Sequence, residues 1–214
     1  MKVALIGASG FVGTQVLKEA LQRGFIVTAI VRNPEKITTH DDKLNLQKGD
    51  VRNVDELAAL LKGHDAVISA YNAGWQNPNI YEDFIAASKD IQEATKKAGV
   101  KRLLVVGGAG SLEIAPGVQL VDTPEFPTQW KAGALAARDY LNILKHEQEL
   151  DWTFLSPAIM LNPGERTGNY RTGTDQPVFD ANGKCEISVE DLAVALVDEL
   201  EDKNYIRKRF TVGY

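Results

Sequence analysis

Residues 3–13 read Val3-Ala4-Leu5-Ile6-Gly7-Ala8-Ser9-Gly10-Phe11-Val12-Gly13. An apolar run leads into glycines spaced three apart, and an apolar pattern of helical period follows to residue 22. This order predicts a buried strand, a tight turn and a helix. Gly7 permits the turn, Gly10 lets a ligand approach the backbone, and Gly13 lets the helix pack against the strand. Free amides at the helix start attract phosphate, so we interpret residues 7–13 as the pyrophosphate site of a dinucleotide.

Beyond this turn, short apolar runs alternate with longer helical patterns, as is typical of parallel βαβ units. We expect strands at residues 3–6, 25–31, 44–47, 65–70, 102–106 and 152–155. We expect helices at residues 11–22, 55–61, 79–98, 129–149 and 189–201. The sequence therefore predicts an α/β fold with a Rossmann-like, doubly wound parallel sheet in a single domain, residues 1–214.

The C-terminal part is less regular than the rest of the chain. Residues 163–183 are rich in Gly, Asn, Thr and Pro, with short extended pieces expected at 169–171 and 186–188 and a last strand at 209–212. We expect residues 157–188 and 203–214 to form a small irregular elaboration on the substrate side. Residues 111–128 show no periodicity and hold three prolines, which predicts a functional or mobile loop.

Composition narrows the class of protein. A net charge of −5 argues against a general nucleic-acid binder, and no apolar run approaches the length of a membrane span. The only cysteine, Cys185, has no disulfide partner in the chain, which favours a reducing, cytoplasmic location and a small core residue. The histidines show no metal-ligand spacing, so we expect no metal. We expect a small-molecule partner and a monomer or homodimer.

The end of the second strand distinguishes between the two nicotinamide dinucleotides. An NAD site commonly places Asp or Glu there for the ribose 2′-hydroxyl, whereas this chain has Arg32. A guanidinium pairs with a 2′-phosphate and stacks on adenine. The sequence favours NADP as cofactor and leaves NAD open; a solvated surface arginine is the alternative interpretation of Arg32.

Two further strand ends reach the same crevice, because ligands in open α/β sheets lie at the carboxyl ends of the strands. Asp50 and Val51 end the third strand, where a carboxylate can accept from the adenine amino group; a plain turn aspartate is the alternative. Ala70, Tyr71 and Asn72 end the fourth strand, where small residues would admit the nicotinamide-side ribose and phosphates.

Several longer motifs accompany these strand ends. They are residues 7–13, Val31-Arg32-Asn33-Pro34, Gly49-Asp50-Val51, Val105-Val106-Gly107-Gly108-Ala109-Gly110-Ser111-Leu112, Leu150-Asp151-Trp152-Thr153-Phe154-Leu155-Ser156-Pro157, Pro163-Gly164-Glu165-Arg166-Thr167-Gly168 and Ile187-Ser188-Val189-Glu190-Asp191-Leu192-Ala193. Together the motifs resemble the atypical, NmrA-like, NAD(P)H-binding branch of the short-chain dehydrogenase/reductase superfamily. Within that branch the chain is most similar to the NADH-flavin reductase group, over essentially its whole length.

The resemblance implies an NAD(P)H-dependent reductase whose flavin, quinone or similar flat acceptor is a substrate rather than a tightly bound group. It places the nicotinamide near the turn of Gly107, Gly108, Ala109 and Ser111 and near the turn of Pro157 and Ala158, under the irregular C-terminal part. Ser111 is a candidate for a hydrogen bond to substrate, with a loop or helix-cap serine as the alternative.

One feature departs from the superfamily. Carbonyl-reducing members use Tyr-x-x-x-Lys, in which the lysine lowers the pKa of the tyrosine that transfers the substrate proton. Lys131 stands at a helix start, but Pro127 lies four residues before it, and neither Tyr81 nor Tyr140 has a lysine four residues on. A flavin or quinone stabilises added electrons in its own rings and demands less of the protein.

The remaining candidates each have a plain structural alternative. Lys131 could hydrogen-bond the nicotinamide ribose, and Trp130 and Tyr71 could stack on a flavin, although solvated or packing roles are open for all three. The C-terminal cations, of which Arg209 is the last, are most simply a solvated edge. A non-catalytic NADP sensor and an epimerase or dehydratase of the extended short-chain type remain alternative functions.

Overall fold

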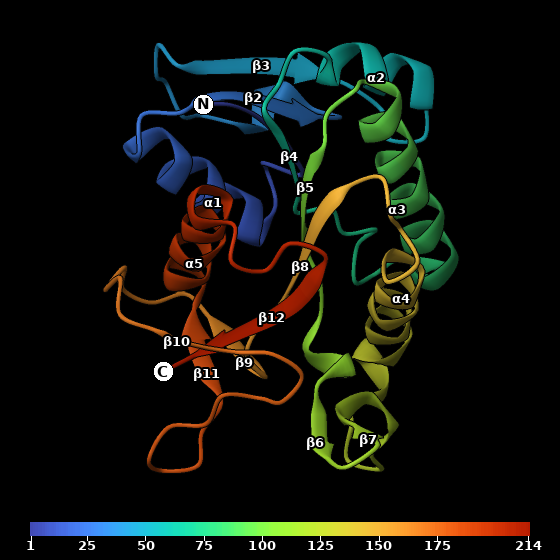
Figure 1. Ribbon diagram of the computed structural model, residues 1–214, viewed down its shortest axis with the longest axis vertical. Helices are drawn as coiled ribbons and strands as arrows, with labels where there is room; N and C mark the ends of the chain where they lie inside the picture. The colour runs from blue at the N-terminus through green and yellow to red at the C-terminus, as the bar shows by residue number, and fades with distance from the viewer.

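The computed structural model describes residues 1–214, and an eight-stranded sheet forms its centre (Figure 1). The strand order is β10-β12-β8-β5-β4-β1-β2-β3, and every neighbouring pair is parallel except β10 with β12. The strands are β1 (Lys2–Ile6), β2 (Ile26–Val31), β3 (Leu44–Lys48), β4 (Ala66–Ser69), β5 (Arg102–Val106), β8 (Asp151–Ser156), β10 (Arg171–Gly173) and β12 (Lys208–Gly213). This order confirms the predicted doubly wound, Rossmann-like sheet.

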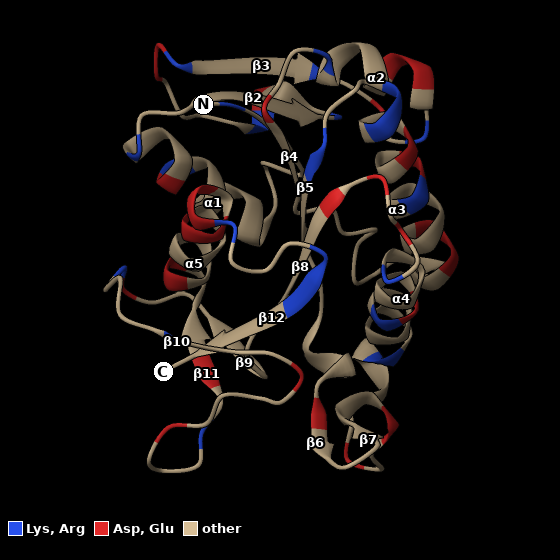
Figure 2. Cartoon of the chain, viewed as in Figure 1, with Lys and Arg blue, Asp and Glu red and all other residues tan.

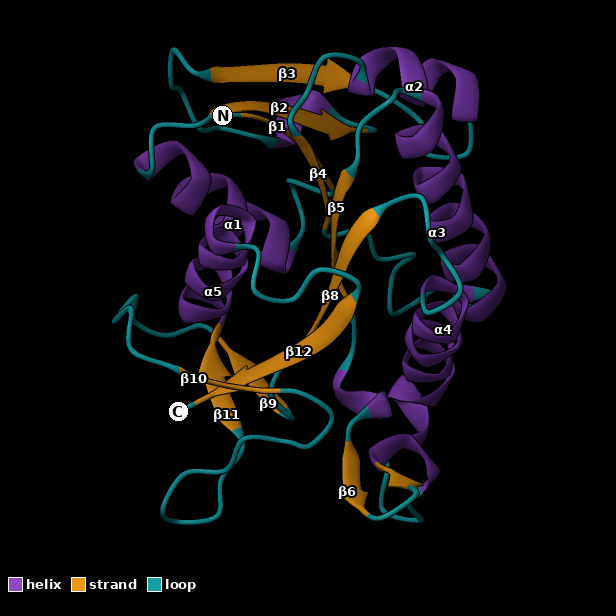
Figure 3. Ribbon diagram, viewed as in Figure 1, coloured by secondary structure: helices purple, strands orange, loops and turns teal.

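Five α-helices cover the two faces of the sheet (Figure 3). They are α1 (Phe11–Gln22), α2 (Val54–Leu61), α3 (Ile80–Lys97), α4 (Thr128–Leu144) and α5 (Val189–Asp202). Helices α1 and α5 pack together on one face, and α2, α3 and α4 pack in a row on the other. Parallel strands buried on both faces need near-continuous apolar sequence, as β1, β4 and β5 have.

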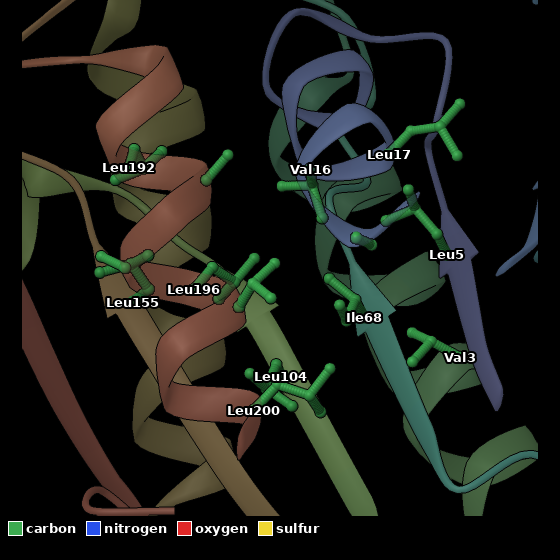
Figure 4. Packing of buried hydrophobic residues seen from close by; sticks show 14 of the residues in the cluster. Val3, Leu5, Val16, Leu17, Ile68, Leu104, Leu155, Leu192, Leu196 and Leu200 are labelled. Carbon is green, nitrogen blue, oxygen red and sulfur yellow. The ribbon is translucent and has the colours of Figure 1, made fainter. Parts of the chain in front are cut away.

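The apolar core is divided by the sheet into two clusters. Figure 4 shows the first cluster, in which Val16 and Leu17 of α1 and Leu192, Leu196 and Leu200 of α5 point toward the strands. Phe84 and Tyr140 anchor the second cluster beneath α3 and α4. Charged side chains lie mainly on the helices and loops, whereas the central strands are almost free of them (Figure 2).

Helix α4 is shorter than the predicted helix of residues 129–149. It ends at Leu144, because the next residues satisfy their amides locally. The Glu147 carboxylate accepts from the backbone N–H of Glu149 at 2.6 Å and of Leu150 at 3.3 Å. Residues 145–149 are all polar, so the apolar period gives no signal of the helix end or of this side-chain cap.

The irregular segments contain more structure than the sequence indicates. Residues 111–128 hold a small hairpin of β6 (Glu113–Ala115) and β7 (Val118–Gln119), together with short 3-10 turns at Ala109–Ser111 (η2), just before it, and Leu120–Asp122 (η3). A further turn, η1, spans Pro34–Lys36. In the C-terminal part, β9 (Met160–Asn162) pairs with β11 (Glu186–Ser188), and β11 confirms the extended piece expected at 186–188. The extended piece expected at 169–171 is shifted and becomes β10.

The loop of residues 163–168 is bound to both helices of the first face. Arg166 forms a bidentate ion pair with the buried Glu19 of α1, with N–O distances of 2.6 and 2.8 Å, and this contact lowers the pKa of Glu19. The fully buried Asp191 of α5 accepts from the amide of Thr167 and from the hydroxyl of Tyr214, each at 2.8 Å. These contacts join the loop of residues 163–168 to α1, to α5 and to the C-terminal residue Tyr214.

A buried ion pair joins β5 to α5, on the face of the sheet that α1 and α5 cover. Arg102 of β5 donates to the Glu199 carboxylate of α5 at 2.7 Å, and Thr153 lies beside both. Both charged side chains are buried, and desolvation lowers the pKa of Arg102. Each charge therefore depends on its partner.

Glu199→Ala should strongly destabilise the protein, because it leaves the Arg102 guanidinium buried without a carboxylate. We expect a loss of about 3–5 kcal/mol in the free energy of unfolding, measured by urea denaturation. Glu201→Ala is the matched control, since Glu201 pairs with Arg23 at the surface of the same helix; it should cost about 1 kcal/mol or less. Equal losses of unfolding free energy in the two variants would contradict the mutual dependence of Arg102 and Glu199.

Candidate functional site

The candidate site lies at the carboxyl edge of the sheet, where the strand order reverses. From β1 the chain builds outward through β2 and β3 on one side and through β4, β5 and β8 on the other. The loops that leave β1 and β4 therefore diverge to opposite faces. A crevice at such a switch point is where open α/β sheets bind ligands.

The turn between β1 and α1 is built on very close backbone contacts. Gly7 has a φ of +82°, and a Cβ there would come within 2.5 Å of the Ala70 carbonyl oxygen. A Cβ on Gly13 would come within 2.1 Å of the Gly7 carbonyl oxygen. Any other residue at position 7 or 13 would push the turn or α1 out of place.

The first turn of α1 presents free backbone donors. Gly10 is the N-cap residue and provides no side-chain cap, and the first helical hydrogen bond is from Thr14 N–H to the Gly10 carbonyl at 2.9 Å. The amides of Phe11, Val12 and Gly13 have no protein acceptor. Ser9, Gly10 and Phe11 are exposed, so the start of this helix is open to an anion. Uncapped amides and the helix dipole fit a pyrophosphate.

Arg32 and Asp50 lie side by side at the ends of β2 and β3, because the Gly49 amide donates to the Val31 carbonyl at 3.1 Å. Arg32 is exposed and has no carboxylate partner. Asp50 accepts from the Arg52 amide at 3.0 Å, which is the plain turn role considered for it. Its second carboxylate oxygen remains free for a ligand. Val51 is half-buried beside it.

Tyr71 lies on the same side of the crevice as Arg32. It is half-buried at the end of β4 and packs on Phe84 of α3, with ring centroids 6.2 Å apart. Burial raises the pKa of Tyr71, and the nearby guanidinium groups of Arg32 and Arg52 oppose that rise. These neighbours place Tyr71 beside the strand ends assigned to the adenosine half. Ala70 is half-buried and Asn72 is exposed next to it.

The loop after β5 forms the other half of the crevice. Gly107, Gly108 and Ala109 are partly exposed there. A Cβ on Gly107 would come within 2.0 Å of the Phe154 ring, so packing alone accounts for that glycine. Ser111 is 2% exposed, and its hydroxyl accepts from Arg209 at 3.1 Å. The structure thus gives Ser111 a bond within the protein.

Arg209 corrects the expectation of a solvated C-terminal edge. The residue is buried, and its guanidinium donates to Ser111 and, at 3.0 Å, to Asp175. It is the second residue of β12. Strand pairing with β8 turns this side chain toward the protein, which the local run of cations does not indicate. Lys203, Arg207 and Lys208 are exposed as expected.

The turn after β8 is more buried than a direct contact with a ligand requires. Pro157 and Ala158 are buried, and Ile159 and Met160 after them are exposed. Just before the turn, the hydroxyls of Ser156 and its strand partner Thr211 are buried without a hydrogen-bond partner. Cys185 is also buried nearby, as expected of a core residue, and burial raises the pKa of its thiol.

Helix α4 borders the crevice with its first turn. Pro127 is the N-cap residue, and Trp130 and Lys131 are exposed. Tyr140 is fully buried against Gln92, and Tyr81 donates to Asp139 at 2.7 Å. The two tyrosines therefore make contacts within the protein. A separate cavity of about 530 Å³ lies between β6 and the segment after β10, lined by Glu113 and residues 173–178.

The switch-point crevice, the three close glycines and the uncapped helix define a Rossmann-type dinucleotide-binding protein. Residues 7–203 match the NAD(P)H-binding family. The chain belongs to this family, and its cofactor is a nicotinamide dinucleotide.

Individual relatives extend over the whole chain. Protein YwnB of Bacillus subtilis is 42% identical over 99% of this chain and 98% of its own length. A Bacteroides thetaiotaomicron structure, provisionally described as an epimerase, is 50% identical with a TM-score of 0.93 and covers 100% of this chain and 96% of its own. A Streptococcus pneumoniae structure, provisionally described as an NADH-flavin reductase, is 37% identical with a TM-score of 0.85, covering 100% and 99%. The likeness supports an oxidoreductase-like protein.

None of the helices has the length and apolar character needed to cross a membrane.

Gly10→Ala should separate binding from folding. A Cβ at position 10 would lie 3.3 Å from the Gly7 carbonyl oxygen, a contact that small shifts relieve. The methyl group would nevertheless project where the phosphates approach. We expect a melting temperature within about 5 °C of the wild type and at least about tenfold weaker dinucleotide binding by calorimetry. Gly13→Ala should lose both thermal stability and dinucleotide binding. Unchanged binding in Gly10→Ala would refute the placement of the phosphates at this turn.

Proposed function

We propose that this protein is an NADPH-dependent reductase that passes two electrons to a flavin, a quinone or a similar flat acceptor. The observation that carries the proposal is the combination of open phosphate donors at α1 with an unpaired arginine at the end of β2. When bound, NADPH supplies the hydride. The chain acts as one unit, in which residues 157–188 and 203–214 form the substrate side.

Different parts of the cofactor bind in the two halves of the crevice. The amides of Ser9 and of residues 11–13, beside the bare Gly10, hold the pyrophosphate. Arg32 takes the 2′-phosphate, and Asp50 and Val51 receive the adenine. The remaining proposed contacts are Ala70, Tyr71 and Asn72 after β4, Gly107, Gly108 and Ala109 after β5, and the buried turn of Pro157 and Ala158 through its backbone. Lys131 bonds the nicotinamide ribose. The bond of Ser111 to Arg209 favours a role in shaping the loop over contact with the acceptor.

The absence of a tyrosine four residues before Lys131 supports a flat acceptor. A carbonyl substrate becomes an alkoxide on reduction and needs a proton donor at once. A flavin or quinone spreads the added charge over its rings, so orientation and exclusion of water suffice. The same absence argues against an epimerase, the provisional description of the Bacteroides relative.

Turnover is the direct test. Purified protein with NADPH should lose absorbance at the nicotinamide band on addition of FMN, riboflavin or a quinone. Tight NADPH binding without turnover on any acceptor would support a cofactor-occupancy sensor in place of a reductase. Absence of binding of either dinucleotide would refute the cofactor assignment itself.

Arg32→Ala should weaken NADPH binding by about tenfold or more and leave NADH binding nearly unchanged, because only NADPH carries the 2′-phosphate. Dissociation constants from calorimetry would measure both. Lys62→Ala is the matched control, since Lys62 is an exposed cation at the C-terminus of α2, away from the carboxyl edge. Equal weakening of both dinucleotides by Arg32→Ala would refute the preference for NADP.

A further inference from the structure

Two exposed tryptophans border the first turns of α4. Trp75, in the loop after β4, is 55% exposed, and Trp130, in the first turn of α4, is 48% exposed. The Trp75 ring lies over Gly133, where a Cβ would come within 2.7 Å of its Cζ3 atom. Trp130 and Gly133 are three residues apart on one helix and share a side. We call Trp75, Gly133 and Trp130 the tryptophan platform.

The platform is next to the loop after β5. Gly110 of that loop packs on α4, since a Cβ there would come within 2.9 Å of the Ala134 Cβ. Ala134 follows Gly133 directly, so the platform and the loop assigned to the nicotinamide contact adjoining residues of one helix. Trp75 reaches this point because its loop leaves β4 at the switch point and crosses to α4.

Exposure of these rings is unusual for their size. A side chain as large and apolar as tryptophan is normally covered, and neighbouring exposed apolar side chains commonly mark a binding surface. Glycine at position 133 leaves the space that the edge of the Trp75 ring occupies, since a Cβ there would lie 2.7 Å from its Cζ3 atom and 3.3 Å from its Cη2 atom. Lys131, between Trp130 and Gly133 in the chain, is exposed and has no carboxylate partner. Lys131 is two positions from Gly133, so its side chain leaves a different side of α4 and stays available to the nicotinamide ribose.

We propose that the tryptophan platform binds the ring system of an oxidised, electron-poor acceptor such as FMN. This inference rests on the proposed function and assigns its acceptor site. The electron-rich indoles stack on an electron-poor isoalloxazine. Two electrons and one proton leave NADPH as hydride, and solvent supplies the second proton, giving NADP⁺ and the reduced flavin. The polar cavity at residues 173–178 suits a flat apolar ring less well.

Trp75→Leu and Trp130→Ala test the platform with two independent variants. Each should raise the KM for FMN by about tenfold, while the dissociation constant for NADPH stays within about twofold, because stacking on an indole contributes to acceptor binding alone. Phe179→Ala is the matched control: Phe179 is 46% exposed but lies beside the polar cavity. An unchanged KM in both tryptophan variants, or a large rise in Phe179→Ala, would overturn the proposal.

A titration without turnover keeps this inference separate from the proposed function. FMN added to the protein with NADP⁺ should quench tryptophan fluorescence with a saturable curve. The double variant Trp75→Leu with Trp130→Ala should lose most of that quenching, since the remaining Trp152 is buried. Saturable quenching without NADPH oxidation would uphold the platform and remove the reductase. Turnover without quenching would uphold the reductase and overturn the platform as its acceptor site. A wild-type dimer that Trp75→Leu converts to a monomer would identify the platform as a subunit interface and overturn the proposal.

Discussion

The contact between Gly13 and the Gly7 carbonyl governs this molecule. It sets how closely α1 approaches β1, and no side chain fits between them. Because α1 is this close, its free amides face the crevice, and α5 can pack beside α1 on the same face of the sheet. The binding site and the core thus depend on the same few ångströms of backbone separation.

Much of the fold follows from local sequence. The apolar runs that become β1, β4 and β5 are short, continuous and bounded by turn residues, so their identity is not ambiguous. The spacing of the three glycines in residues 7–13 by itself indicates a tight turn and a closely packed helix. Arg32 and Asp50 could be placed in one crevice because consecutive parallel strands end at the same edge.

The rest of the site depends on contacts between residues far apart in the chain. Nothing near Arg209 indicates that β12 pairs with β8 and turns the guanidinium toward Ser111. Trp75 lies in a polar loop, and nothing in that loop indicates that its ring contacts Gly133 of α4. Likewise the turn after α4 is held by the carboxylate of Glu147, a contact that apolar periodicity does not register.

The loop of residues 163–168 has a consequence for redesign of the chain. Ion pairs and buried hydrogen bonds attach it to Glu19 and Asp191, so its length is fixed at both ends. An inserted peptide or affinity label would have to break buried charges there. Residues 180–184 form an exposed turn held mainly by its own Asp180. Surface grafts are better tolerated where few buried groups are disturbed, and this turn is such a place.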